Sequence, residues 1–153
     1  MTTIHIVELP VESLDRLRPL WESLKEHHLA RFRQPSFRAD MAGKSWDERK
    51  RELIRPDKAL KIVAAQTDGR LIGYCIATIG DDCRGEIDSL YVAADFRGLA
   101  VGTRLVETVL GWFEAAGIRA IAISVAYGNE EALRFYEKFG FQPRSYCLQR
   151  VGG

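Results

Sequence analysis

A glycine-containing turn is the part of this chain best suited to bind a charged ligand. It reads Arg97-Gly98-Leu99-Ala100-Val101-Gly102-Thr103 and joins a predicted strand to a predicted helix. Glycine lets the backbone approach a ligand closely, and the first N–H groups of a helix have no partner within the helix. The helix dipole adds partial positive charge there, and Arg97 adds a full one. The turn therefore predicts a site for a phosphate-bearing ligand.

Changes in apolar periodicity indicate a mixed α/β fold around that turn. Alternating residues predict a strand over 4–7, a hairpin over 61–77 and a third antiparallel strand over 84–92. The apolar run 120–125 predicts a strand that is covered on both faces and parallel to the strand before the turn. Helices are predicted from 101 to Gly117 and over 129–139, and a last strand or hairpin arm over 141–151. We expect a single domain over 1–153 with a central β-α-β unit.

The N-terminal third is predicted to be helical, with interruptions. Leucines and Trp21 recur at helical spacing over 14–28, and Pro19 predicts a kink or two abutting helical pieces. The segments 34–36 and 42–43, which contain proline and glycine, predict a loop. Ser45 and Glu48 have the spacing of a capping box, which starts a short helix that ends before Pro56.

Composition and charge argue against several classes of protein. The net charge of +1 over 153 residues does not indicate the clearly basic face that binding to nucleic acid would favour. No apolar run is long enough to cross a bilayer and the N-terminus lacks a signal-peptide core, so we expect no membrane partner and a cytoplasmic location. Cys75, Cys83 and Cys147 have no Cys-x-x-Cys spacing, which predicts free, mostly buried thiols and no metal site. The two adjacent histidines at 27–28 are expected to lie at an exposed helix end and not to be metal ligands.

A second motif indicates which family these elements resemble. The pattern Asn129-x-x-Ala132-x-x-Phe135-Tyr136-x-x-x-Gly140-Phe141 is similar, at every named position, to a signature of the GCN5-related N-acetyltransferases (GNAT). The turn resembles the family's other signature, Gln/Arg-x-x-Gly-x-Gly/Ala, except that Ala100 stands in place of a glycine. The resemblance runs from Ile62 onward. It implies a GNAT-like acyl-CoA N-acyltransferase fold, in which the strands of the β-α-β unit splay apart to hold coenzyme A (CoA).

The resemblance implies a site for acetyl-CoA as the acyl donor. The turn, from Arg97 through Gly98, Leu99, Ala100, Val101 and Gly102 to Thr103, would hold the pyrophosphate. Leu90, Tyr91 and Val92 would pair with the pantetheine arm like an extra strand, and Asn129 would form a hydrogen bond with that arm. The N–H of Leu90 would face the thioester carbonyl and stabilise its oxyanion.

The resemblance also implies direct transfer to a primary amine in a ternary complex, without a metal. Tyr136 resembles the family's general acid, which protonates the departing thiolate. The attacking amine must first lose a proton, and Glu86 stands four residues before Leu90, where family members with a glutamate base carry it. Asp88 is expected on the same strand face, because strand side chains alternate. Glu86, Asp88 and water therefore all stay open as the base.

The amine acceptor is not determined by these motifs. By resemblance, its pocket is expected among the N-terminal helices, the loop over 32–44 and the C-terminal strands. Aromatic residues there form either core or pocket wall, and the carboxylates of Glu22, Glu26 and Asp40 can attract an amine. We expect a small-molecule amine; a protein amine and a non-catalytic acyl-CoA-binding domain are the alternatives, and an acyl group longer than acetyl also stays open. The resemblance allows a homodimer through the last strands or the apolar helix faces.

Overall fold

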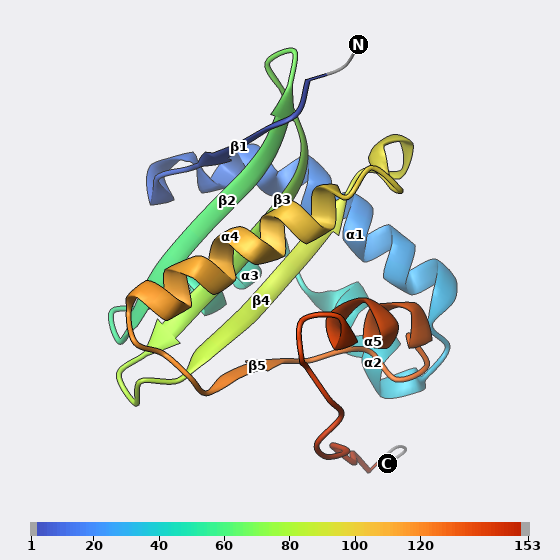
Figure 1. The fold of residues 1–153 in the computed structure, drawn as a ribbon. Helices are drawn as coiled ribbons and strands as arrows, with labels where there is room; N and C mark the ends of the chain where they lie inside the picture. The colour runs from blue at the N-terminus through green and yellow to red at the C-terminus, as the bar shows by residue number, and fades with distance from the viewer. Residues whose placement is uncertain (1–2, 151–153) are drawn as a thin grey trace.

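A five-stranded mixed sheet forms the centre of the computed structural model, which describes residues 3–150 (Figure 1). The strands lie in chain order: β1 (His5–Glu8), β2 (Lys58–Thr67), β3 (Arg70–Gly80), β4 (Gly85–Val92) and β5 (Ile121–Ile123). The first four are antiparallel, and β5 is parallel to β4. The predicted mixed α/β architecture and its β-α-β unit are thus confirmed. Within the described residues, no helix is both long and apolar enough to cross a membrane.

Helices cover both faces of this sheet. Helix α4 (Val101–Ala115) crosses one face, and α1 (Arg18–Arg31) and α3 (Trp46–Leu53) lie on the other (Figure 1). The remaining helical segments are α2 (Pro35–Gly43), α5 (Glu130–Glu137) and 3-10 turns over Val11–Leu17 and Ala94–Phe96. The core under α4 includes Leu105, Val109 and Phe113, each fully buried, because two apolar rows of that helix face the sheet.

Most local predictions for the N-terminal half are confirmed. A 3-10 helix ends at Leu17 and α1 begins at Arg18, because Pro19 fits only the first turn of a helix. The hydroxyl of Ser45 accepts a hydrogen bond from the Glu48 N–H (3.1 Å) and caps α3. The predicted loop at 34–36 and 42–43 is wrong, since Gln34 is the N-cap residue of α2 and residues 35–36 and 42–43 belong to that helix. The Gln34 side chain accepts a hydrogen bond from the Phe37 N–H (2.7 Å) and supplies the cap.

The C-terminal predictions need correction. Residues 141–150 form no strand, and Val151 lies outside the described residues. Strand β5 is shorter than predicted and only half-buried, with Ala122 exposed, because it lies at the edge of the sheet with β4 as its one described neighbour. Of the three thiols only Cys75 is buried; Cys83 and Cys147 are exposed. An alternating pattern predicts a strand only where a neighbouring strand can accept its hydrogen bonds, and the described chain offers none to 141–150.

A β-bulge in β4 sets the geometry of the site. Ile76 pairs with Ser89 and Ala77 pairs with Ile87, so Asp88 has no partner in β3. Strand β5 pairs with β4 only from Gly85 to Ile87, so β4 and β5 diverge beyond the bulge. The predicted splay of the two parallel strands is therefore present, and it begins at the bulged residue.

Candidate active site

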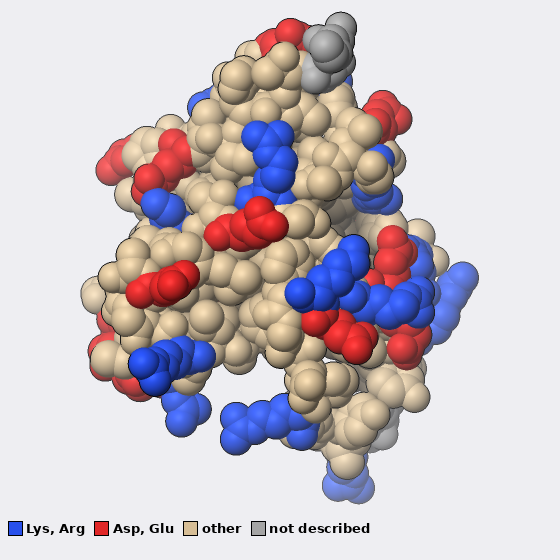
Figure 2. Space-filling view, viewed as in Figure 1, with Lys and Arg blue, Asp and Glu red and all other residues tan. Residues whose placement is uncertain are grey.

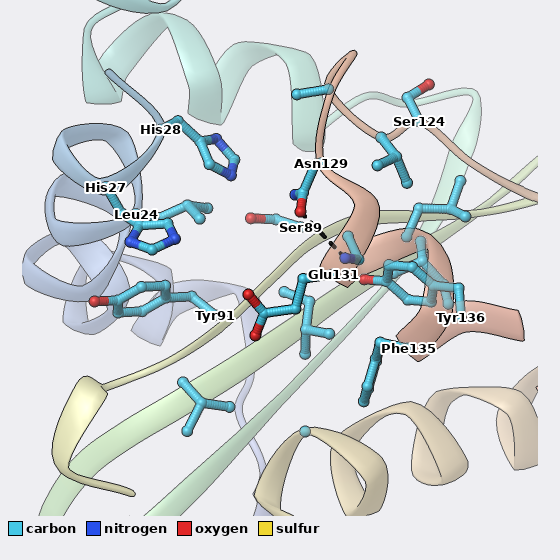
Figure 3. Close-up of a pocket in the computed structure, with 18 of the residues that line it drawn as sticks. Leu24, His27, His28, Ser89, Tyr91, Ser124, Asn129, Glu131, Phe135 and Tyr136 are labelled. Carbon is cyan, nitrogen blue, oxygen red and sulfur yellow. Dashed lines mark hydrogen bonds between the residues drawn. The ribbon is translucent and has the colours of Figure 1, made fainter. Parts of the chain in front are cut away.

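A single cavity of about 910 Å³ occupies the gap where β4 and β5 diverge. Its walls come from β4, the turn before α4, the segment after β5, α5, and the facing sides of α1 and α2 (Figure 3). Every residue predicted to bind the acyl donor lines this cavity except Leu99, whose side chain is 56% exposed to solvent. The structure therefore brings the two sequence motifs together in one site.

The turn before α4 presents unpaired amides to this cavity. Gly98 and Ala100 have φ angles of 80° and 59°, and Ala100 is the N-cap residue of α4 without a side-chain cap. Within residues 3–150, the first N–H groups of the helix therefore receive no side-chain cap, which is the arrangement that suits an anion. Arg104, in the first turn of α4, donates to the Ile4 carbonyl (3.0 Å) and does not line the cavity.

The free edge of β4 faces the cavity through alternate residues. The Ala93 N–H donates to the Ile72 carbonyl in β3 (2.8 Å), and backbone groups alternate in direction along a strand. The N–H groups of Val92 and Leu90 therefore point away from β3, toward the splay. Consistently, the Val92 carbonyl accepts a hydrogen bond from Arg97 Nε (3.0 Å), and the Arg97 guanidinium lies over the Tyr91 ring.

Tyr136 of α5 places a phenol in the middle of the cavity. Its side chain is buried, its ring makes edge contacts with Phe135 and Phe141, and its hydroxyl points into the cavity (Figure 3). Burial raises the pKa of Tyr136 above its ordinary value, because desolvation penalises the phenolate. The hydroxyl is therefore protonated at neutral pH and can act as a proton donor.

Asn129 has two functions in the geometry of α5. Its Oδ1 accepts a hydrogen bond from the Ala132 N–H (3.1 Å), which caps the helix. The same side chain lines the cavity opposite α1, and its amide nitrogen has no hydrogen-bond partner within residues 3–150 (Figure 3). The cap thus holds the amide in position while its donor group remains available to a ligand.

The two carboxylates of β4 differ in their access to the cavity. The prediction that Glu86, Asp88 and Leu90 share a strand face holds for the two carboxylates, since Thr78 pairs with Glu86 and donates to Asp88, but it is wrong for Leu90, because the bulge interrupts the alternation. Leu90 packs with the core under α4, and Asp88 lies on the opposite face. Asp88 lines the cavity, whereas Glu86 is exposed and does not.

The surroundings of Asp88 favour its neutral form. Burial and the neighbouring Glu86 carboxylate raise the pKa of Asp88 to about 7. Thr78 Oγ1 donates to Asp88 Oδ2 (2.7 Å), and Arg49 donates to the Asp88 main-chain carbonyl (2.7 Å). A carboxyl group with a pKa near neutrality inside a cavity suits proton transfer.

Comparisons with known proteins agree with this geometry. The profile of the Acetyltransferase (GNAT) family matches residues 21–141. The chain belongs to the GNAT family. An uncharacterised N-acetyltransferase of Mycobacterium tuberculosis is 33% identical over 100 residues, and the match covers 65% of this chain. The match spans 63% of that relative's own length.

Solved GNAT structures share the fold over almost the whole chain. The PaiA N-acetyltransferase of Thermoplasma acidophilum, in complex with coenzyme A, superposes with a TM-score of 0.74 at 22% identity and covers 95% of this chain and 93% of its own. An aminoglycoside N-acetyltransferase in complex with CoA gives a TM-score of 0.69 at 20% identity, with 99% of this chain and 96% of its own covered. At these identities the likeness concerns the fold.

Within this GNAT site, sequence reasoning missed His28. It is not an exposed helix end: the ring contacts Phe32 and Phe37, lines the cavity, and leaves Nδ1 buried without a partner in the described residues. Burial lowers the pKa of His28 to about 4, so the imidazole is neutral at pH 7. Among the aromatic residues of the N-terminal helices, Trp21 and Phe37 line the cavity, whereas Phe32 and Trp46 do not.

An ion pair also joins the two walls of the cavity. Arg31, at the end of α1, lies 3.4 Å from Glu131 of α5, and Figure 2 shows charges of both signs together over α5. Both partners are largely exposed, so the pair contributes little to stability. No group of three or more histidine, cysteine or acidic side chains is arranged to hold a metal within residues 3–150.

Proposed function

We propose that this protein transfers the acetyl group of acetyl-CoA directly to the primary amine of a small molecule, in a ternary complex. The observation that supports this most strongly is the meeting of Tyr136, the Leu90 edge and Asp88 in one cavity that extends to the turn before α4. The structural neighbours that were crystallised with CoA support the choice of donor.

The residues of the cavity fit the parts of CoA. The uncapped amides at the start of α4 and the charge of Arg97 suit a pyrophosphate, and the outward N–H groups of Leu90 and Val92 suit the amides of pantetheine. When bound, acetyl-CoA supplies the thioester whose carbon accepts the amine. The Leu90 N–H then stabilises the oxyanion on that carbonyl.

Proton transfers complete the reaction. Asp88 accepts one proton from the ammonium group, so that the nitrogen can attack the thioester carbon. As the C–S bond breaks, Tyr136 gives its proton to the sulfur. The nitrogen releases a second proton to solvent as the amide forms, and solvent returns one proton to Tyr136, so the proton that Asp88 accepted is the net proton released. Burial keeps Tyr136 protonated, and a pKa of about 7 leaves roughly half of the Asp88 groups ionised at pH 7 and able to accept the proton.

The experiment is a measurement of CoA release from acetyl-CoA over a panel of primary amines, with matched tyrosine variants. We expect Tyr136→Phe to lower kcat by at least about 100-fold, because it removes the acid but preserves the ring. Tyr127→Phe is the control, since Tyr127 is exposed and outside the cavity. Full activity of Tyr136→Phe would remove Tyr136 from the reaction, and CoA binding without turnover on any amine would overturn the transferase assignment in favour of an acyl-CoA-binding domain.

The assignment of the base is tested by pH. We expect log kcat/KM to rise with unit slope up to a pKa of about 7, because Asp88 must be ionised to accept a proton. Asp88→Asn should remove this ascending limb, and Glu86→Gln should retain it. The opposite pattern would make Glu86 the base.

A homodimer stays a prediction for this chain. Its support is that β5 lies at the sheet edge and that Tyr146 and Leu148, in the segment without a strand, are 82% and 91% exposed. Light scattering coupled to size-exclusion chromatography tests it, and a monomeric mass at high protein concentration would contradict it.

A further inference from the structure

The end of the cavity beyond Leu90 carries charges of both signs. This acceptor end is opposite the turn before α4, and it contains the side chains of Asp88, Asp40, Arg49, Lys44 and Lys25. Arg49 is fixed beside Asp88, because its Nη2 donates to the Asp88 main-chain carbonyl at 2.7 Å. A cationic and an anionic group therefore lie next to each other where the amine must enter.

The cations of the acceptor end are not balanced by its ion pairs. Arg49 and Lys44 share one carboxylate, that of Glu52, at 3.0 and 2.8 Å. Lys25 donates to the Lys44 main-chain carbonyl (2.8 Å) and lies over the Trp21 ring, but it forms no ion pair within residues 3–150. Within the described residues these three positive groups thus form ion pairs with one carboxylate, and the carboxyl groups of Asp40 and Asp88 at the same end pair with none of them.

These charges discriminate among classes of amine. A polycationic acceptor would meet repulsion from Lys25, Lys44 and Arg49 when its amine reaches Asp88. A simple alkyl amine, whose one charge is its ammonium group, would leave the partly desolvated Lys25 ammonium with no anionic partner beside the Lys44 carbonyl and the Trp21 ring. An acceptor that carries a carboxylate beside its amine satisfies both signs, because its ammonium group faces Asp88 and its carboxylate faces Lys25 and Arg49.

We propose that the acceptor is a small zwitterion of the amino-acid class, with its ammonium group at Asp88 and its carboxylate between Lys25 and Arg49. This inference rests on the proposed function, since it names the substrate class of the same site. Arg49 is partly buried and bound on both sides, so it supplies a fixed charge. Lys25, with no carboxylate partner, supplies the charge that the substrate neutralises.

The experiment compares matched acceptors that differ only in the carboxylate. Each of alanine, leucine and phenylalanine is assayed with acetyl-CoA beside its amide and its decarboxylated amine, and spermidine represents the polycations. In at least one series, we expect kcat/KM for the amino acid to exceed that for its amide and that for its decarboxylated amine by about tenfold or more. This is the effect of one charge-assisted hydrogen bond. Equal or faster turnover of the amides, the simple amines or spermidine would overturn this inference while the proposed function stands. Absence of turnover on every amine would overturn both.

A lysine variant locates the effect in the cavity. Lys25→Gln should lower the ratio of kcat/KM for the preferred acid over its decarboxylated amine by about tenfold, and Lys25→Arg should restore most of it. Lys61→Gln is the control, because Lys61 pairs with Glu8 outside the cavity and should leave the ratio unchanged. A ratio that is unchanged in Lys25→Gln would contradict the assignment of Lys25 to the carboxylate.

Discussion

Replacing Ala100 with glycine should stabilise the protein, although glycine usually weakens a helix terminus that has a good cap. Ala100 has φ 59° and ψ 22°, which is the left-handed region, and its side chain provides no cap. An L-residue in this conformation costs roughly 1–2 kcal/mol relative to glycine. Glycine, however, loses more conformational entropy on folding than alanine does, which costs about 0.5–1 kcal/mol. The net gain in unfolding free energy is therefore about 0.5–1 kcal/mol.

Thermal unfolding is the assay for this prediction. For a chain of this size, about 1 kcal/mol corresponds to a shift of roughly 2–4 °C, so Ala100→Gly should raise Tm by about 1–4 °C. Ala39→Gly is the matched control, since Ala39 is exposed within α2 and its replacement should lower Tm by a similar amount. Equal losses of Tm in the two variants would refute the left-handed conformation of Ala100 as the source of strain.

Three further predictions concern other parts of the fold. Because burial lowers the pKa of His28 from 6.5 to about 4, the unfolded chain binds a proton that the folded chain does not between these values, and stability falls as pH falls through this window. Between pH 7 and pH 5, the unfolding free energy of the wild type should therefore fall by about 2 kcal/mol more than that of His28→Phe, as measured by denaturant titration at each pH. A difference in unfolding free energy between the two proteins that does not change with pH would contradict this. Gly85→Ala places a methyl 2.5 Å from the buried ring of Phe113, so it should lower the unfolding free energy by about 1–3 kcal/mol, and Phe113→Leu in the same chain should recover part of the loss. Gln34→Ala removes the acceptor of the Phe37 N–H and should destabilise α2 by about 1 kcal/mol, visible as faster amide exchange in α2 with no change in α3.

Local features of the sequence determined much of this protein. The periodicity of 101–115, the cap at Ser45 and the break at Pro19 each depend on residues that are close in the chain, so short-range chemistry is sufficient to predict them. The same holds for the motif that contains Asn129 and Tyr136, whose spacing on one helix follows from the chain itself. The family, the fold and, apart from Leu99, the motif residues that line the cavity could therefore be predicted.

Long-range contacts decided the rest. The bulge at Asp88 arises from the register between β3 and β4, and it moves Asp88 into the cavity and onto the face opposite Leu90. The neutral state of His28 depends on its burial, to which its contacts with Phe32 and Phe37 contribute, and the charges of the acceptor end come from α1, α2, α3 and β4 together. Register, burial and the meeting of charges from separate elements depend on how the whole chain packs, and no local pattern specifies them. The sequence by itself determined the two motifs, whereas the tertiary structure decided which carboxylate and which cations line the cavity with them.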